Sequence, residues 1–286
     1  MKRQSFAFLF CIICALVCVV IWYAVYTLEA GRNLAVRFFD IGQGDGIFIE
    51  LPNHVQVLID GGPSNAILSK LGDAMPFWDR TIDLVVLTHP HADHVDGLID
   101  VMKRYDVGMV IESGVSYATP DYNEWNRLLK EKHIPVVYAR RGQRVRLSEK
   151  GILDILSPLR EVAGKRFANV HDSMVVSRLA YGSKSMLFMG DGEKPIEYRL
   201  ISDGESLVSD VLKIGHHGSK TSTIKEFLDA VRPSMAVISV GRKNKYGHPY
   251  EEVVDRILAA SIRLFRTDTD GDVVLMSDGE HIWKSN

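Results

Sequence analysis

After residue 18 the sequence contains no cysteine, because all three cysteines, Cys11, Cys14 and Cys18, lie in one apolar run near the N-terminus. This excludes a disulfide framework and a cysteine-based metal site from the rest of the chain. We interpret the three cysteines, which recur at helical spacing, as small polarizable residues on one helix face. The remaining chain must be stabilised by its apolar core and by any metal that it binds.

An excess of charge of either sign is also missing, since the formal net charge is −2. Such a balance allows an anionic substrate without requiring one. The sequence has 286 residues, 46% of them hydrophobic, which is enough for one large core or two modest ones. Because no linker, low-complexity tract or short repeat interrupts it, we expect residues 31–286 to form one domain.

No charged residue occurs between Phe6 and Leu28, over about 23 residues. This run exceeds the apolar core of a cleavable signal peptide and is long enough to cross a bilayer as a helix. The preceding Met1-Lys2-Arg3 predicts a cytoplasmic N-terminus and an extracytoplasmic remainder. We therefore expect residues 1–30 to be an uncleaved, single-pass signal anchor in the cytoplasmic membrane. A cleaved signal peptide stays open, although Leu28-Glu29-Ala30 is a poor cleavage site.

The rest of the sequence alternates between apolar strand patterns and amphipathic helix patterns. We expect strands at residues 34–39, 46–51, 55–60, 82–87, 108–111, 136–138, 143–147, 151–156, 174–180, 185–189, 211–214, 235–240 and 272–276. We expect helices at residues 64–75, 95–105, 121–132, 224–231 and 249–260, and a further helix beginning near Pro195. Mixed strands with helices on both outer faces predict an α/β (α+β) protein, a layered αββα sandwich with functional loops at one edge.

Two of these helices have predicted start signals. Thr223 and Glu226 have the spacing of a capping box, in which each side chain satisfies a backbone donor of the first turn. Pro249 suits the first helical position, with His248 as the capping residue.

The segment from Thr88 to His94 places three imidazoles and a carboxylate directly after an apolar strand. Imidazole and carboxylate are ligands for divalent ions such as zinc and manganese. His89 and His91 are two residues apart and point the same way from extended backbone, whereas Asp93 and His94 fall on the following turn. The spacing therefore predicts two metal ions.

Later strand ends supply further candidates. The expected strand 185–189 runs into Gly190-Asp191, and Asp191 is the candidate that bridges both ions. The alternative is that Asp191 caps the helix near Pro195. Of His216, His217 and His248, we favour His216 and His248 as metal ligands and consider His217 equally near, but spacing alone leaves the choice open. His217, His248 and Lys220 are also candidate donors to negative charge that develops on the substrate.

Several motifs occur together in one order. They are Phe38-Phe-Asp-Ile-Gly-Gln-Gly-Asp45, Leu58-Ile-Asp-Gly-Gly62, Thr88-His-Pro-His-Ala-Asp-His94, Ser173 to Leu179, Gly190-Asp191, Val211-Leu-Lys-Ile-Gly-His-His-Gly-Ser219 and Asn244-Lys-Tyr-Gly-His-Pro249. In this set the chain resembles the metallo-β-lactamase-like domain of the ComEC competence protein family. The resemblance covers nearly everything after residue 33.

The resemblance implies a metallo-β-lactamase sandwich with two divalent ions, zinc or manganese, and nuclease action on DNA at the outer face of the membrane. It implies that His89 and His91 hold one ion, that Asp93 and His94 hold the other, and that Asp191 bridges them. It also implies supporting positions around the site, with Asp60 orienting a histidine. The members expected beside the site are Asp40, Gln43 and Asp45.

The chain departs from this resemblance in two ways. Many related enzymes have a histidine ahead of the bridging aspartate, whereas here Asn169 and Ser173 resemble the ComEC form. His171 restores that ligand if it faces the site, and a solvated loop histidine is the alternative. ComEC proteins also couple the hydrolase to a channel of many spans, while this chain has one apolar span. A role in DNA import, a channel partner and the oligomeric state therefore stay open.

A nucleic-acid substrate needs basic side chains beside the site, because phosphate contacts supply most of the affinity. Two clusters qualify, Arg140-Arg141 with Arg144 and Arg146, and Arg242-Lys243 with Lys245. The alternative for either cluster is an ordinary solvated face. The candidates for base stacking are Tyr246, Tyr250 and Trp78.

These observations favour a membrane-anchored metal-dependent hydrolase, specifically a phosphodiesterase or nuclease. A second hypothesis keeps the metals but assigns a small ester, a lactone or a cell-wall phosphodiester as substrate. A third hypothesis, a noncatalytic DNA-binding or partner-binding module, requires loss of ligands, and the intact histidine and aspartate set argues against it.

Overall fold

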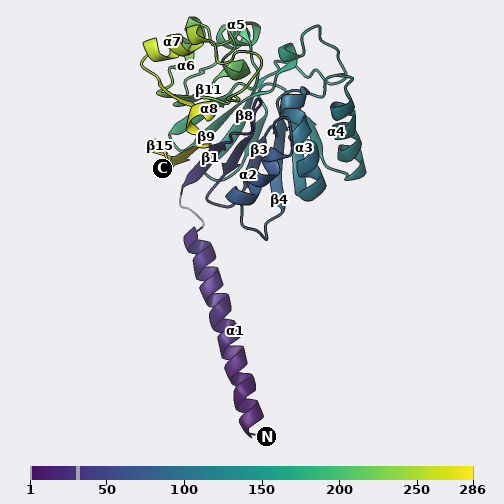
Figure 1. Cartoon of the computed structure of the whole chain (residues 1–286), viewed down its shortest axis with the longest axis vertical. Helices are drawn as coiled ribbons and strands as arrows, with labels where there is room; N and C mark the ends of the chain where they lie inside the picture. The colour runs from purple at the N-terminus through teal and green to yellow at the C-terminus, as the bar shows by residue number, and fades with distance from the viewer. Residues whose placement is uncertain (1, 30–32, 286) are drawn as a thin grey trace.

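The computed structural model describes residues 2–29 and 33–285. Its body has the predicted αββα layering, so the expected fold class is confirmed. Figure 1 shows this body with the first helix, α1 (Lys2–Glu29), projecting away from it. Within α1, Ala7–Tyr26 is long and apolar enough to cross a membrane, and none of it is buried against the body. The expected boundary between residues 30 and 31 lies outside the described residues, so the division into two parts stays a prediction.

The first sheet has eight strands in the order β15-β14-β1-β2-β3-β4-β5-β6. Its strands are β1 (Leu34–Phe38), β2 (Ile47–Glu50), β3 (Gln56–Ile59), β4 (Thr81–Leu87), β5 (Asp106–Glu112), β6 (Val136–Tyr138), β14 (Val273–Ser277) and β15 (Ile282–Lys284). The strands from β3 to β6 are parallel, so their carboxyl ends meet at one edge.

The second sheet has seven strands in the order β13-β12-β11-β10-β9-β8-β7. Its strands are β7 (Arg144–Arg146), β8 (Gly151–Ser157), β9 (Val176–Tyr181), β10 (Lys184–Phe188), β11 (Val211–Lys213), β12 (Met235–Ile238) and β13 (Arg263–Arg266). The strands from β10 to β13 are parallel. The two sheets enclose an apolar core, to which each contributes alternate side chains.

Helices cover the outer face of each sheet (Figure 1). Those on the first sheet are α2 (Ala66–Ala74), α3 (Ala92–Arg104) and α4 (Pro120–Glu131). Those on the second sheet are α5 (Lys194–Ser202), α6 (Lys225–Val231) and α7 (Glu251–Ala259). The remaining helical segments are one-turn pieces, namely η1 (Val170–Ser173), η2 (Gly215–Gly218) and α8 (Thr267–Asp270).

Both predicted start signals are wrong. Helix α6 begins at Lys225, and neither Thr223 nor Glu226 caps it. Instead, the carboxylate of Glu197 on α5 accepts the backbone N–H groups of Thr223 and Ile224. Helix α7 begins at Glu251 rather than Pro249, and the capping position is Tyr250 rather than His248. The Tyr250 N–H donates to the carbonyl of Gly218, which fixes where the chain enters α7.

Helix α3 begins at Ala92, three residues earlier than expected, so Asp93 and His94 lie in its first turn. Its close approach to the end of β3 depends on glycine. A Cβ atom added at Gly97 would lie 1.9 Å from the carbonyl oxygen of Gly61. This contact brings the start of α3 beside Asp60, which follows β3, and so prepares one side of the site.

Candidate active site

The candidate site lies where strands of both sheets end. The loop after β4 carries His89 and His91, the turn after β10 carries Asp191, and η2 after β11 carries His216 and His217. The two edges are joined by a hydrogen bond from the Val175 N–H to the Thr88 carbonyl, at 2.9 Å. A pocket of about 300 Å³ opens here and is lined by Gln43, His91, Ala92, Asp93, His171, Asp191, His216, His217, Tyr246 and His248.

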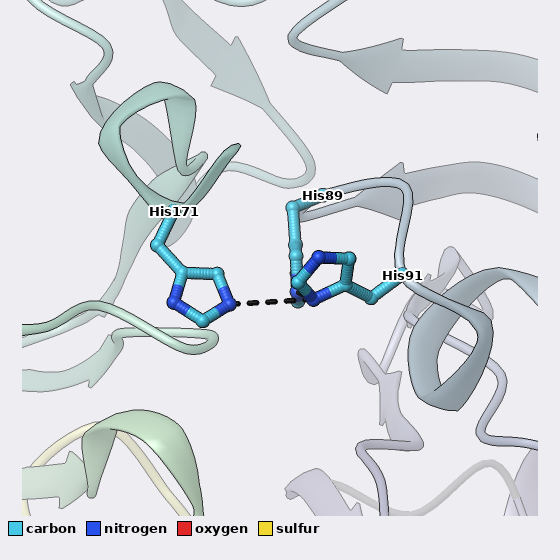
Figure 2. Close-up of side chains that lie close together, drawn as sticks. All are labelled: His89, His91 and His171. Carbon is cyan, nitrogen blue, oxygen red and sulfur yellow. Dashed lines mark hydrogen bonds between the residues drawn. The ribbon is translucent and has the colours of Figure 1, made fainter. Parts of the chain in front are cut away.

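Three histidines form the first ligand group, which consists of His89, His91 and His171 (Figure 2). The Nδ1 atom of His91 lies 3.0 Å from Nε2 of His89 and 3.3 Å from Nε2 of His171. His171 is 8% exposed, and the loop and helix η1 aim its ring at the other two. The side chain of His171 therefore faces the site and is not a solvated loop histidine.

The second ligand group consists of Asp93, His94, Asp191 and His217. The Oδ1 atom of Asp191 lies 3.4 Å from Nε2 of His94 and 3.3 Å from Nε2 of His217. Oδ2 of Asp93 lies 3.6 Å from the same His217 nitrogen. Of the three later histidines, His217 is thus the one that joins this group.

Asp191 lies between the two ligand groups. Its Oδ1 atom faces the second group, while its Oδ2 atom lies 3.9 Å from Nε2 of His89 in the first. The alternative prediction, in which Asp191 caps helix α5, is wrong, because Glu193 occupies the N-cap position of α5. One carboxylate oxygen therefore points toward each group.

These distances fit divalent metal ions. Two ligands of a tetrahedral ion, bound at about 2.0 to 2.1 Å, lie about 3.3 Å apart. The separations of 3.3 and 3.4 Å around Asp191 Oδ1 match this value. Moreover, Nε2 of His94, Nε2 of His217 and Oδ1 of Asp191 are buried and have no hydrogen-bond partner among the described residues. Buried polar atoms that converge without hydrogen-bond partners indicate a place for a bound ion.

The charges of the second group also favour a cation. Burial alone lowers the pKa of His94, but the carboxylates of Asp191, Asp60 and Asp93 together hold that pKa well above its usual value. Burial raises the pKa of Asp191, but His217 and His94 outweigh it and hold that pKa well below the usual range. The group is therefore rich in negative charge and is stabilised by added positive charge.

Both histidines of the second ligand group are held from behind by an oxygen. Asp60, which we expected to orient a histidine, lies 2.7 Å from Nδ1 of His94 and also accepts the Thr88 N–H and hydroxyl. Nδ1 of His217 lies 2.9 Å from the carbonyl oxygen of Ser239. These bonds place an N–H on Nδ1 and direct Nε2 toward the centre of the group.

Glu193 holds the rings on the other side of the pocket. Its carboxylate lies 3.5 Å from Nδ1 of His171 and 3.2 Å from Nδ1 of His216, and it accepts the hydroxyl of Thr221 at 2.6 Å. His216 also faces the site, since its Nε2 atom lies 3.8 Å from Oδ2 of Asp191. His171, Glu193 and His216 thus form a third group whose side chains could hold a metal ion, and it shares His171 with the first group.

The backbone at His216 and His217 is left-handed, with φ of 47° and 52°. Such a conformation costs energy in residues other than glycine and persists only where surrounding contacts enforce it. Here it turns consecutive imidazoles to different partners, His216 to Glu193 and His217 to Asp191.

His248 belongs to neither ligand group in the part of the chain that the structure describes. It lies at the pocket wall between Tyr246 and Tyr250, with ring centroids 5.8 and 5.6 Å away. Lys220 is exposed and lies over the ring of Tyr250 at 5.6 Å, outside the pocket lining. As ligand or donor, these two residues are therefore less well placed than His217.

The remaining residues that we expected to support the site differ in whether they line the pocket. Gln43 lines the pocket, and its side-chain oxygen accepts the Gly241 N–H at 3.2 Å. Asp40 is not among the residues that line the described pocket, and its backbone N–H donates to Asp272 at 2.7 Å. Ser173 is fully buried and donates to the carbonyl of Val170 at 2.6 Å, so it supports the loop rather than the pocket. Asp45 is buried against Lys213.

Sequence reasoning missed Lys213 and Glu193. Lys213 is fully buried, and its ammonium group pairs with Asp45 and donates to the carbonyl of Gly190 at 2.9 Å. A single lysine within an apolar strand was the available signal, since a buried charge needs a partner. For Glu193, the signal was an acidic residue two positions after Asp191.

The two basic clusters differ in place. Arg242, Lys243 and Lys245 are exposed on the loop that continues to Tyr246 and His248, and we call this segment, residues 242–245, the basic loop. In the other cluster, Arg141 and Arg144 form ion pairs with acidic neighbours. None of that cluster lines the described pocket, which favours the solvated-face alternative for it.

Comparisons with known proteins agree with this geometry. Residues 40–242 match the model of the metallo-beta-lactamase superfamily. The chain is 29% identical over 255 residues to ComE operon protein 3 of Bacillus subtilis (strain 168), covering 83% of this chain and 32% of that protein. It is 30% identical over 247 residues to competence protein ComA of Neisseria gonorrhoeae, covering 84% and 32%. The chain thus spans about a third of the length of these relatives.

Among solved structures, the metallo-beta-lactamase fold protein YhfI from Bacillus subtilis superposes with a TM-score of 0.57 at 13% identity, covering 88% of this chain and 100% of that one. This likeness concerns the fold. The similarity to ComEC-family competence proteins is confirmed by the sequence relatives. The histidine and aspartate groups indicate divalent metal binding. The chain belongs to the metallo-beta-lactamase superfamily, whose fold is that of metal-dependent hydrolases.

Proposed function

We propose that the chain is a membrane-anchored phosphodiesterase that cleaves DNA outside the cytoplasmic membrane with two divalent ions, zinc or manganese. The observation that carries the proposal is the pair of candidate ligand groups with Asp191 between them, 3.4 Å from His94 in one group and 3.9 Å from His89 in the other. His89, His91 and His171 would hold one ion, and Asp93, His94 and His217 the other. Two such ions supply Lewis acidity and activate water at neutral pH.

The protein's own side chains prepare the site for this chemistry. Asp60, Glu193 and the Ser239 carbonyl fix ring orientations before substrate arrives, so no reorganisation is needed during the reaction. His216 and His248 line the pocket and are available to donate to the oxygens of a bound phosphodiester. We assign no metal bond to His248, which belongs to no candidate metal group among the described residues, whereas His216 is also a candidate ligand together with His171 and Glu193.

The substrate assignment depends on the surroundings of the pocket. The basic loop offers three cations beside His248, and Tyr246 is half exposed, with Lys245 over its ring at 5.2 Å. Cations and an accessible aromatic ring together suit a polynucleotide, which needs both phosphate and base contacts. Similarity to ComEC-family competence proteins favours DNA.

A smaller substrate is the second candidate. The pocket of about 300 Å³ accommodates an ester, a lactone or a cell-wall phosphodiester, and the net charge of −2 creates no general attraction for nucleic acid. A noncatalytic binding module is disfavoured, because both ligand groups are intact.

The full-length protein, loaded with manganese or zinc, should be incubated with plasmid, with single-stranded DNA and with bis-p-nitrophenyl phosphate. We expect cleavage of DNA that stops on addition of a chelator and in Asp191→Asn. The matched control Asp229→Asn, at an exposed position on α6, should retain full activity.

Alanine replacement of all three cations of the basic loop separates the two candidates. The replacement should slow DNA cleavage and make the cleavage rate less dependent on salt concentration. The hydrolysis of bis-p-nitrophenyl phosphate should stay unchanged. Cleavage of the small phosphodiester alone by the unaltered protein would reject DNA as substrate. Chelator-resistant cleavage would reject the metal site.

The proposed topology has its own test. In intact spheroplasts, an added protease should digest the domain after residue 33 while the N-terminus stays protected. Protection of the domain until the membrane is permeabilised would place it in the cytoplasm and refute the orientation.

A further inference from the structure

The turn between α2 and β4 exposes two adjacent aromatic side chains, Phe77 and Trp78. Phe77 is 77% exposed, and no large apolar side chain among the described residues is more exposed. Trp78 is 48% exposed, and the two rings meet edge to face with centroids 4.8 Å apart. Adjacent large aromatic side chains in water are costly, so such a patch indicates contact with an apolar partner.

The turn is firmly held, so its exposure is not the result of a loose loop. The N–H of Asp79 donates to the carbonyl of Pro76 at 2.9 Å and closes the turn. The Asp79 side chain accepts both the N–H and the hydroxyl of Thr81, at 3.0 and 2.7 Å, and the amide of Gln56 at 2.8 Å. The backbone therefore presents both rings outward in one conformation.

This turn lies against the last turns of helix α1. The rings of Trp22 and Trp78 are 4.9 Å apart, and the ring of Tyr26 stacks on His54 at 4.6 Å. The apolar window of α1 ends at Tyr26, and Trp22 lies four residues, or about 6 Å, before that end. Trp78 therefore lies close to the end of the window, at the level of Trp22.

Tryptophan and tyrosine gather where the hydrocarbon of a bilayer meets its headgroups, because their rings are apolar with a polar edge. Trp22 and Tyr26 have this position at the end of the apolar window. Since Trp78 touches Trp22, a bilayer that surrounds α1 also reaches the exposed turn.

We infer that the Phe77-Trp78 turn inserts into the interfacial layer of the bilayer and, together with α1, seats the domain in one orientation on the membrane. The occupant of this surface is lipid, at the boundary of headgroups and acyl chains. The inference goes beyond the proposed hydrolase activity, and it rests on the proposed membrane insertion of α1.

This orientation of the domain determines where the candidate active site lies relative to the membrane. Strand β4 begins at Thr81, just after the turn, and its seven residues span about 23 Å before the loop that carries His89 and His91. In Figure 1, α1 extends from the side of the body opposite to α5 and α7. The pocket therefore faces away from the membrane, which suits a substrate that arrives from solution rather than a lipid.

Quenching of tryptophan fluorescence by brominated phosphatidylcholine tests the inference. The sequence has four tryptophans, at positions 22, 78, 125 and 283. The full-length chain is placed in vesicles of phosphatidylcholine with and without brominated acyl chains, in a Trp22→Phe background that removes the tryptophan of the span. Adding Trp78→Phe should abolish most of the remaining quenching. The matched control Trp283→Phe, at a 39% exposed position on β15, should leave the quenching unchanged.

Extraction at alkaline pH separates this inference from the proposed anchor. If the chain resists extraction but Trp78 is not quenched, the turn does not enter the bilayer and the inference is overturned while the anchor stands. If the chain is extracted, α1 is not inserted, and both fail. If Trp78 is shielded only when the chain self-associates, the surface binds a second copy and the lipid assignment is wrong. Phe77→Ser with Trp78→Ser should lower quenching without changing hydrolysis of bis-p-nitrophenyl phosphate.

Discussion

Replacing Glu193 by glutamine should weaken one ligand group and spare the other. Glu193 lies 3.5 Å from Nδ1 of His171 in the first ligand group, and it contacts no member of the second group among the described residues. Glutamine keeps the size of the side chain but removes the charge that polarises the imidazole. Removal of such a supporting carboxylate typically lowers metal affinity about 10-fold to 100-fold, or about 1.4 to 2.7 kcal/mol.

The assay is metal retention during titration with a competing chelator. The unaltered protein should release two ions at high chelator concentrations, and Glu193→Gln should release one of them at a concentration about 10-fold to 100-fold lower. The matched control Glu226→Gln, at an exposed position on α6, should behave like the unaltered protein.

A double-mutant cycle ties the effect to His171. In a His171→Ala background, Glu193→Gln should have almost no further effect on metal retention, because the ring that it supports is gone. Additive losses, or equal weakening of both ions by Glu193→Gln alone, would refute the reasoning that this carboxylate acts through His171.

Two further predictions concern buried charges. Burial raises the pKa of Glu112 to about 7 despite the hydrogen bond from Trp125. The contribution of the protonated carboxyl to the stability of the fold is therefore full at low pH and is lost as the pH rises toward 7. The substitution Glu112→Gln should therefore raise the free energy of unfolding by more at about pH 8 than at about pH 5, by up to roughly 3 kcal/mol. Unfolding at both pH values measures this difference. An equal effect of the substitution at both values would contradict the burial argument. Lys213→Met should cost about 3 to 5 kcal/mol, since it leaves Asp45 buried and unpaired, and adding Asp45→Asn should restore part of this loss. A double variant as unstable as the sum of the single ones would show that the pair is not coupled.

The fold could be predicted because its signals are local. The apolar strands before His89 and Asp191 stand out in the sequence, and the helices between strands have clear periodicity. The short edge strands β13 and β15 were missed. Arg263–Arg266 has charges at both ends, and Ile282–Lys284 has three residues, so neither carries a periodic signal. Pairing with a neighbour in the sheet, and not the local sequence, makes them strands.

The site could be predicted only as far as spacing reaches. The loop from His89 to His94 and the turn at Asp191 project from strand ends, so their meeting follows from the sheet. The choice of His217 over His248 depends on the left-handed backbone of η2 at His216 and His217. This conformation has no marker in the sequence, because neither His216 nor His217 is a glycine. Likewise, His171 reaches the site through a one-turn helix in a loop, and the start of α6 is capped from α5 by Glu197. Each of these depends on contacts between distant segments.

The measurement that tests the central claim most directly is anomalous X-ray diffraction from crystals of the full-length protein grown with manganese or zinc. We predict two peaks about 3.5 to 4 Å apart, one at each ligand group, with the carboxylate of Asp191 in contact with both. A single peak, or two peaks of which only one touches Asp191, would contradict the account.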